Sequence, residues 1–132
     1  MKALMAALYT KLSAGTALLA ELGAGTPIFH DIVPPDAALP AVVYSYIAGG
    51  DDNTTPRRTK GVVVSVKGVA ETLGEAADVD VQLDALLHDQ AGSVTGWTNY
   101  WLMRETDFSY AEQSAGEIFW HVGGHYRIRL SK

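Results

Sequence analysis

Hydrophobic residues at helical spacing open the chain. They recur three or four positions apart, at Leu4, Met5, Leu8 and Leu12. This spacing predicts an amphipathic helix that ends near residues 13–15. Thr16 can cap a short second helix, which would continue to Leu22 and end at the glycines Gly23 and Gly25.

The clearest helical pattern covers residues 72–89. Its apolar stripe consists of Ala76, Val79, Leu83, Leu86 and Leu87. Thr72 and Glu75 have the spacing of a capping box, in which each side chain bonds the other's backbone N–H. Residues 71–90 contain six acids and no Lys or Arg, and the acids are Glu71, Glu75, Asp78, Asp80, Asp84 and Asp89.

Alternating patterns predict the strands. The predicted extended segments are residues 28–33, 41–48, 60–69, 94–105 and 117–130. Between them we expect a Pro-rich turn at 34–36, a long loop at 49–59 and a polar connection at 108–116. Gly123-Gly124 inside the last strand indicates a bulge or a close approach of another part of the chain.

The order of these elements indicates the fold class. Most strands are adjacent in sequence and one helix is inserted between them, so we expect an α+β fold: a mostly antiparallel sheet with helices on one face. The length of 132 residues and the lack of repeats or linkers favour a single domain over residues 1–132.

Composition narrows the function classes. The chain is 48% hydrophobic and 19% charged, which is typical of a globular protein. It has no cysteine, which excludes disulfides, thiolate metal sites and a cysteine nucleophile. The net charge of −5 argues against a DNA-coating protein. No stretch has the roughly 20 apolar residues of a membrane span, and Lys11 interrupts the signal-like start, so we expect neither a membrane partner nor export by a signal peptide.

Candidate metal ligands are sparse. His121 and His125 lie on a predicted strand, where four residues separate Cα atoms by about 13 Å, too far for one ion. The run Asp51-Asp52-Asn53-Thr54 could supply oxygen ligands, but it lacks the spacing of a calcium loop, and such residues are common in solvated loops. We therefore expect no metal and no cofactor.

Catalytic patterns are also missing. There is no Gly-x-Ser-x-Gly turn, and the Gly-rich pieces near residues 23–25 and 49–50 lack the Gly-Lys-Ser/Thr ending of a phosphate loop. The acids of residues 71–90 are typical of a solvated helix face or of a surface that binds a partner. We assign no catalytic residue and expect the protein not to be an enzyme.

Opposite charges are segregated along the chain. Four of the ten basic residues lie within eleven positions, at Arg57, Arg58, Lys60 and Lys67, and Arg127 and Arg129 follow on the last strand. The acidic helix comes directly after the first group. A solvated surface explains such runs, but two opposite patches on one small domain also suit a ring in which different surfaces of identical subunits meet.

The layout as a whole resembles the tail-completion, or tail-terminator, proteins of long-tailed bacteriophages and prophages. The resemblance is carried by the order and spacing of these segments: the opening helix 4–12, Ile28-Phe29-His30-Asp31-Ile32-Val33-Pro34, Leu39-Pro40-Ala41-Val42-Val43-Tyr44, Val62-Val63-Val64-Ser65-Val66, the acidic helix, and His125-Tyr126-Arg127-Ile128-Arg129. It implies a structural role without catalytic residues.

The resemblance implies a ring, usually sixfold, that docks on the finished tail tube, stops tube polymerisation and offers a surface to the head connector. The implied partners are further copies of the chain, the tail tube protein and the head-connector protein, while DNA passes without specific binding. The implied location is the tail–head junction of the virion, with assembly in the host cytoplasm.

Two sets of site residues follow as hypotheses. We expect a loop to contact a neighbouring component through Asp51, Asp52, Asn53, Thr54, Thr55, Pro56, Arg57 and Arg58. We expect subunit-interface or channel-facing charges at Glu71, Glu75, Asp78, Asp80, Asp84, Arg127 and Arg129.

Two alternatives remain open on the sequence. The first is another neck component, a head-closure or connector protein. The second is a small-molecule-binding α+β domain with a pocket near Trp97, Trp101 and Trp120, although tryptophans are more often core or interface residues.

Overall fold

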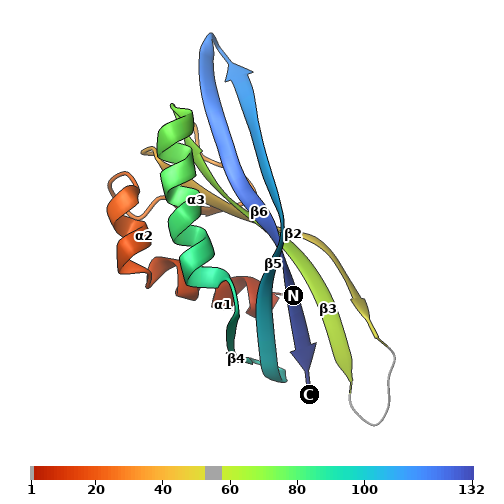
Figure 1. Ribbon diagram of the computed structural model, residues 1–132. Helices are drawn as coiled ribbons and strands as arrows, with labels where there is room; N and C mark the ends of the chain where they lie inside the picture. Colours follow the sequence, from red (N-terminus) through yellow and green to blue (C-terminus); the bar gives the residue numbers. More distant parts are fainter. Residues whose placement is uncertain (1, 53–57) are drawn as a thin grey trace.

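A six-stranded sheet with three helices on one face forms the protein (Figure 1). The computed structural model describes residues 2–52 and 58–132. The helices are α1 (Lys2–Ser13), α2 (Thr16–Glu21) and α3 (Leu73–Leu87). The strands are β1 (Ile28–His30), β2 (Ala41–Asp51), β3 (Thr59–Ala70), β4 (Gln90–Val94), β5 (Trp97–Ser114) and β6 (Glu117–Ser131).

The strand order across the sheet is β1-β2-β3-β6-β5-β4. Only β1 and β2 run parallel, and every other neighbouring pair is antiparallel. The predicted fold class, α+β with a mostly antiparallel sheet packed against helices on one face, is confirmed.

The core lies between the helices and one face of the sheet. Alternate residues of β3 and β6 point into it, as the period of two requires. Its members include Leu4, Leu8 and Leu12 of α1, Val79, Leu83 and Leu87 of α3, Val62, Val64 and Val66 of β3, and Tyr126, Ile128 and Leu130 of β6. We call the sheet face without helices the open face.

Helix α3 begins at the predicted cap, Thr72, but the predicted capping box forms only in part, because the Glu75 carboxylate bonds the Thr72 hydroxyl instead of its backbone N–H. The Thr72 hydroxyl oxygen accepts from the Glu75 backbone N–H at 3.2 Å, and the same hydroxyl lies 3.2 Å from the Glu75 carboxylate. The helix ends at Leu87, two residues before the predicted end, and Asp89 has a positive φ of 56°. Helix α2 differs from the prediction at its start, because Gly15 is the N-cap and Thr16 is the first helical residue.

Strands extend further than the sequence pattern indicated. β2 continues to Asp51 and β3 begins at Thr59, so the predicted loop is wrong for residues 49–51 and 59. Backbone pairing explains the difference, since Gly49 pairs with Val62 and Gly50 with Gly61 without any side-chain contribution. Asp52 and Arg58 lie outside the strands, as predicted, and residues 53–57 lie outside the described residues.

The predicted polar connection at residues 108–116 is wrong. Residues up to Ser114 belong to β5, which pairs with β6 as far as Ser114↔Glu117. A two-residue turn, Ala115-Gly116, joins the strands, and both residues have the positive φ of a tight hairpin. Residues 109–118 are all exposed, so this hairpin tip lacks the alternation that identifies a strand. In Figure 1 the tip extends beyond α3.

The start of β5 also differs from the prediction. Val94 belongs to β4, and β5 begins at Trp97 rather than at the predicted position 94. The polar strand β4 was not predicted at all. The first strand is shorter than predicted, because Asp31 leaves the extended conformation with a φ of 68°.

Gly123-Gly124 is a close approach, as predicted. A Cβ atom on Gly123 would lie 2.3 Å from the Val66 carbonyl oxygen, and one on Gly124 would lie 2.7 Å from Nε of Arg104. The bulge of this region falls on the partner strand, at Glu105 in β5, where the pairing with β6 shifts register. The two glycines therefore make room for neighbouring backbone and for Arg104.

Candidate functional site

Arg104 connects α3 to the sheet. Its guanidinium forms two parallel hydrogen bonds to Asp80 of α3, at 2.8 and 2.9 Å. It also donates to Asp107 at 2.7 Å, to the Tyr126 hydroxyl at 3.1 Å and to the Gly123 carbonyl at 3.0 Å. These five bonds use all five N–H groups of an arginine.

Burial and neighbouring charges shift the pKa values of Arg104 and Tyr126 in opposite directions. Only 11% of the Arg104 side chain and 17% of the Asp80 side chain are exposed. Burial alone would lower the pKa of Arg104, but its hydrogen bonds to Asp80 and Asp107 and the nearby Tyr126 raise this pKa above its usual value. Burial raises the pKa of Tyr126 to about 12 despite the positive charge beside it. Arg104 therefore stays charged and Tyr126 stays protonated at neutral pH.

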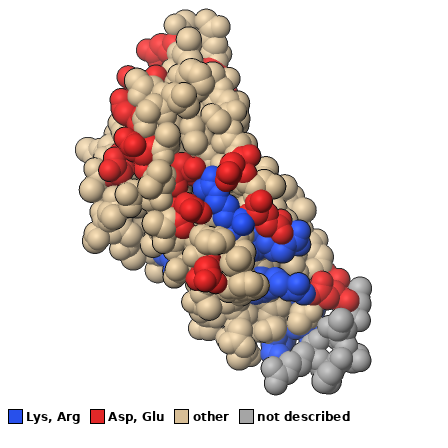
Figure 2. Space-filling model, in the orientation of Figure 1, with Lys and Arg blue, Asp and Glu red and all other residues tan. Residues whose placement is uncertain are grey.

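The acids predicted on α3 divide into two groups. Asp80 is bound to Arg104, and Asp84 lies 3.9 Å from the same guanidinium. Among the described residues, Glu71, Glu75 and Asp78 form no ion pair, although the Glu75 carboxylate accepts a hydrogen bond from the Thr72 hydroxyl. Figure 2 shows acidic side chains gathered along the upper left of the molecule, over α3.

Three of the predicted basic residues, Arg58, Arg127 and Arg129, form ion pairs within the chain. Arg127 donates to Glu105, Arg129 to Asp52 at 3.1 Å, and Arg58 to Asp51 at 2.8 Å. The hydrogen bond to Glu105 raises the pKa of Arg127, and that to Asp51 raises the pKa of Arg58. Lys and Arg accordingly lie beside acidic side chains in a strip toward the lower end of Figure 2.

These pairs also organise the predicted loop. Asp51 and Asp52 at one end, and Arg58 at the other, are held by Arg58–Asp51 and Arg129–Asp52. Thr59 adds a hydrogen bond to Asp52 at 2.8 Å. The remaining loop residues of the hypothesis, Asn53, Thr54, Thr55, Pro56 and Arg57, lie outside the described residues.

A cluster of rings on the open face was not predicted. Tyr110 stacks on His121 with ring centroids 4.5 Å apart, and Phe108 contacts both Tyr110 and His125. Lys67 donates to the Tyr110 hydroxyl at 2.6 Å.

His121 belongs to this cluster and is buried. Burial, together with the charge of Lys67, lowers its pKa. The ring cluster joins β3, β5 and β6 on the face away from the core. Ring contacts between strands have no signature in sequence, because they depend on the register.

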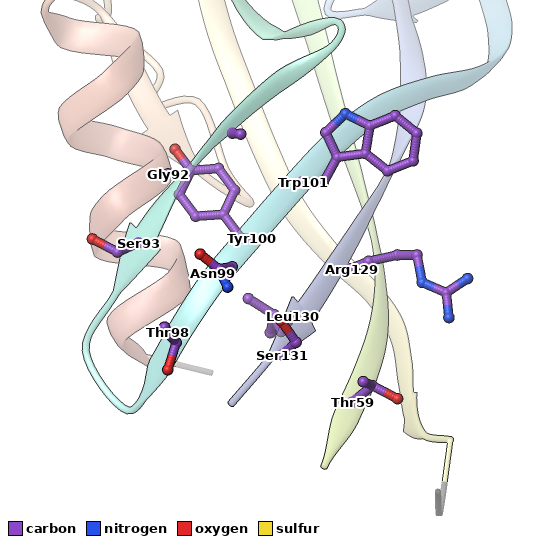
Figure 3. Close-up of a pocket in the computed structure, with 11 residues that line it drawn as sticks. Thr59, Gly92, Ser93, Thr98, Asn99, Tyr100, Trp101, Arg129, Leu130 and Ser131 are labelled. Carbon is purple, nitrogen blue, oxygen red and sulfur yellow. The ribbon is translucent and has the colours of Figure 1, made fainter. Parts of the chain in front are cut away.

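The predicted tryptophan pocket does not form. Trp101 lines an open cavity of about 740 Å³ beside Tyr100, Asn99 and Arg129, and in Figure 3 Tyr100 and Trp101 point to opposite sides of β5. Trp97 packs against the core, beneath Arg58 and Lys132. Trp120 is nine positions from Arg129 on β6, about 30 Å along the strand. The three rings therefore lie apart.

No metal or membrane feature emerges from the described residues. They contain no group of three or more His, Asp or Glu that could hold a metal ion. Within residues 2–52 and 58–132, no helix is both long and apolar enough to cross a membrane.

Comparison with known families identifies the chain. The family model described as "Tail completion protein gp17" matches residues 6–122. The chain belongs to this family. Members are structural proteins of a phage tail and not enzymes, in agreement with the resemblance and the lack of a catalytic motif in the sequence.

A solved structure is similar to the protein in fold. It is a chain of the "Virion of native gene transfer agent (GTA) particle", with a TM-score of 0.77 and 18% sequence identity. The match covers 99% of this chain and 96% of that chain, so the two folds correspond over nearly their whole length. No curated protein sequence matches the chain.

The Arg104–Asp80 pair generates a prediction on stability. Asp80→Asn should lower the free energy of unfolding by about 2–4 kcal/mol, because it leaves a mostly buried guanidinium without its main counter-charge. Asp78→Asn removes the same charge from the exposed side of α3 and should change it by less than about 0.5 kcal/mol. Urea denaturation of both variants measures the difference. Equal effects would mean that the pair does not anchor α3.

Proposed function

We propose that the protein caps the end of the tail tube as a ring of identical subunits. The ring would stop tube polymerisation and present the surface to which the head connector joins, at the tail–head junction. The family match over residues 6–122 carries the proposal, since completion of a tail is the role that its description names. The fold likeness to a chain of a gene transfer agent virion adds support, because that chain is part of a phage-like particle.

Ring formation has a direct test. Six copies of a 14.1 kDa chain give a particle of about 85 kDa. We expect native mass spectrometry to detect this species, either at high concentration or when purified tail tubes supply the template, and electron microscopy to image it as a ring. A protein that remains monomeric in both conditions would contradict the proposal.

We propose that the loop over residues 51–58 contacts a neighbouring component. The ion pairs at its base support this, because they hold Asp51, Asp52 and Arg58 together at one end of the sheet, and loops carried on a rigid scaffold are common binding sites.

The test replaces residues 53–57 by a Gly-Ser linker and retains Asp51, Asp52 and Arg58, so that the base of the loop keeps its pairs. We expect the variant to fold with the thermal stability of the wild type but to lose attachment to tail ends in a sedimentation assay. Attachment at the wild-type level would refute a role for the loop.

We also propose that Glu71, Glu75 and Asp78 face the passage through which DNA moves. Their lack of ion pairs among the described residues supports this assignment, because free carboxylates repel phosphates and would keep the DNA from adhering. Replacing all three by lysine should slow DNA release from assembled particles, measured as the rate of DNA ejection. An unchanged rate would exclude the channel assignment. Replacement by glutamine is the control that removes charge without attracting DNA.

A further inference from the structure

Two stretches of the sheet have an outer edge without a neighbouring strand. Strand β4 pairs with β5 only as far as Leu102, so within the part of the chain that the structure describes no strand covers the outer edge of residues 106–114. Strand β1 pairs with β2 only at residues 42–44, and the outer edge of residues 46–51 is likewise uncovered by any described strand. We call these stretches the β5 edge (residues 106–114) and the β2 edge (residues 46–51).

The backbone of the β5 edge directs hydrogen-bonding groups outward. The two-residue turn at 115–116 makes Ser114 and Glu117 a hydrogen-bonded pair. By the alternation of an antiparallel ladder, Ala111 and Gln113 then direct their N–H and C=O groups away from β6. Such an edge is a template for another strand, and native proteins usually protect it with charged residues or proline. Neither of these two residues provides that protection.

The β2 edge is also unprotected. Residues 46–50 carry no charge and no proline. Tyr46 is 38% exposed and Ile47 is 53% exposed. The register of β2 with β3 shifts between Tyr46 and Ala48, so Ile47 stays out of the ladder and leaves an exposed apolar side chain at the edge. Both edges thus have the composition of strands that become paired in an assembly.

The two edges are placed so that copies of the chain can pair them. They lie on opposite sides of the sheet and toward opposite ends of it (Figure 1). Three successive antiparallel pairs lead from β2 to β5, so these two strands run in opposite directions. The registers place Ala48 level with Met103, eight residues before Ala111. A copy in the same orientation, placed beside the sheet and moved about 25 Å along the strands, therefore brings its β2 edge antiparallel to the β5 edge.

Neither β1 nor β4 obstructs this contact. With Ala48 of the copy beside Ala111, residues 42–44 of the copy, which β1 covers, would lie at or beyond the turn of the hairpin. Strand β2 ends at Asp51, three residues past Ala48. Leu102, the residue nearest the hairpin tip that β4 covers, is nine positions before Ala111. The uncovered stretches therefore meet each other and not a covered part of the sheet.

This placement favours a second copy of the chain over a strand of another protein. A foreign strand would cover one edge and leave the other open. A copy covers both kinds of edge with a single type of contact, because each subunit gives its β2 edge to one neighbour and its β5 edge to the other. A contact between two different surfaces of identical subunits is also the type that closes into a ring.

We propose that subunits join by strand addition at these edges, so that β2 of one subunit pairs with β5 of the next and the sheet continues around the ring. Main-chain hydrogen bonds supply the contact, as in other cases of strand addition to an open sheet edge. The inference rests on the proposed ring of subunits and names the contact that holds it together.

The lack of cysteine in the chain allows a test by crosslinking. The full-length variant with both Ala48→Cys and Ala111→Cys is treated with a short bismaleimide, under the conditions in which native mass spectrometry detects the ring. We expect a ladder of linked species up to the complete ring on a denaturing gel. The matched control combines Ala48→Cys with Ser93→Cys, at an exposed position of the edge strand β4, and should give no ladder.

Chains with a single cysteine test whether unlike edges meet. A mixture of the Ala48→Cys chain and the Ala111→Cys chain should give linked dimers and nothing larger, and neither chain alone should be linked. Linking of the Ala111→Cys chain to itself would mean that like edges meet, which overturns the proposal. A ring without a link between positions 48 and 111 also overturns it but leaves tail capping intact. A protein that forms no ring contradicts tail capping itself, and this inference falls with it.

A proline variant tests the backbone contact directly. Ala111→Pro removes an N–H that β6 does not use, and it should weaken ring formation by about tenfold. Ala111→Thr retains the N–H and should assemble like the wild type. Circular dichroism and thermal denaturation verify that both variants fold. Assembly of the folded proline variant at the wild-type level would contradict pairing at this edge.

A photocrosslinker at Ala111 in assembled particles then identifies the occupant of the β5 edge. Mass spectrometry of the linked peptide should find residues 46–51 of a second copy. Capture of a different virion protein, or no capture, would refute the assignment.

Discussion

The saturated guanidinium of Arg104 is the interaction on which the arrangement of α3, β5 and β6 depends. A charge that is nine-tenths removed from water is tolerated only when its donors are satisfied. The N–H groups of Arg104 donate to a carboxylate of α3, to another of β5, and to a hydroxyl and a carbonyl of β6. Together with the core packing of Val79, Leu83 and Leu87, this one side chain fixes the position of the helix relative to the hairpin.

The same requirement explains the local sequence of β6. Gly124 lies beneath the guanidinium, where any Cβ would be within 2.7 Å of Nε, and Gly123 supplies the carbonyl acceptor. Tyr126 places its ring and its hydroxyl against Arg104 at 5.6 and 3.1 Å. These residues form one unit, and the bulge at Glu105 follows from it, because β5 must bring Arg104 and Asp107 to the same side.

Much of the fold was predictable because it rests on local rules. The N-cap at Thr72, the apolar stripe of α3 and the alternation of β3 each depend on residues that are close together in the sequence. The hairpin tip was missed because both its faces are exposed to water. No alternation of apolar and polar residues is needed there, so the sequence does not show the pattern of a strand. The partner of Asp80 was missed for another reason. An acidic residue on a predicted helix is expected to face solvent. Only the register of β5 brings Arg104, 24 residues further along the chain, into contact with Asp80.

The exposed tip of the β5–β6 hairpin has a consequence for the evolution of the chain. Residues 113–118 contribute no buried side chain, and beyond the contacts of Tyr110 and Glu112 with His121 two strands hold each other without a core. Substitutions there cost the monomer little folding free energy, so the monomer places few limits on their identity. Related chains can therefore diverge at this tip while keeping the same scaffold.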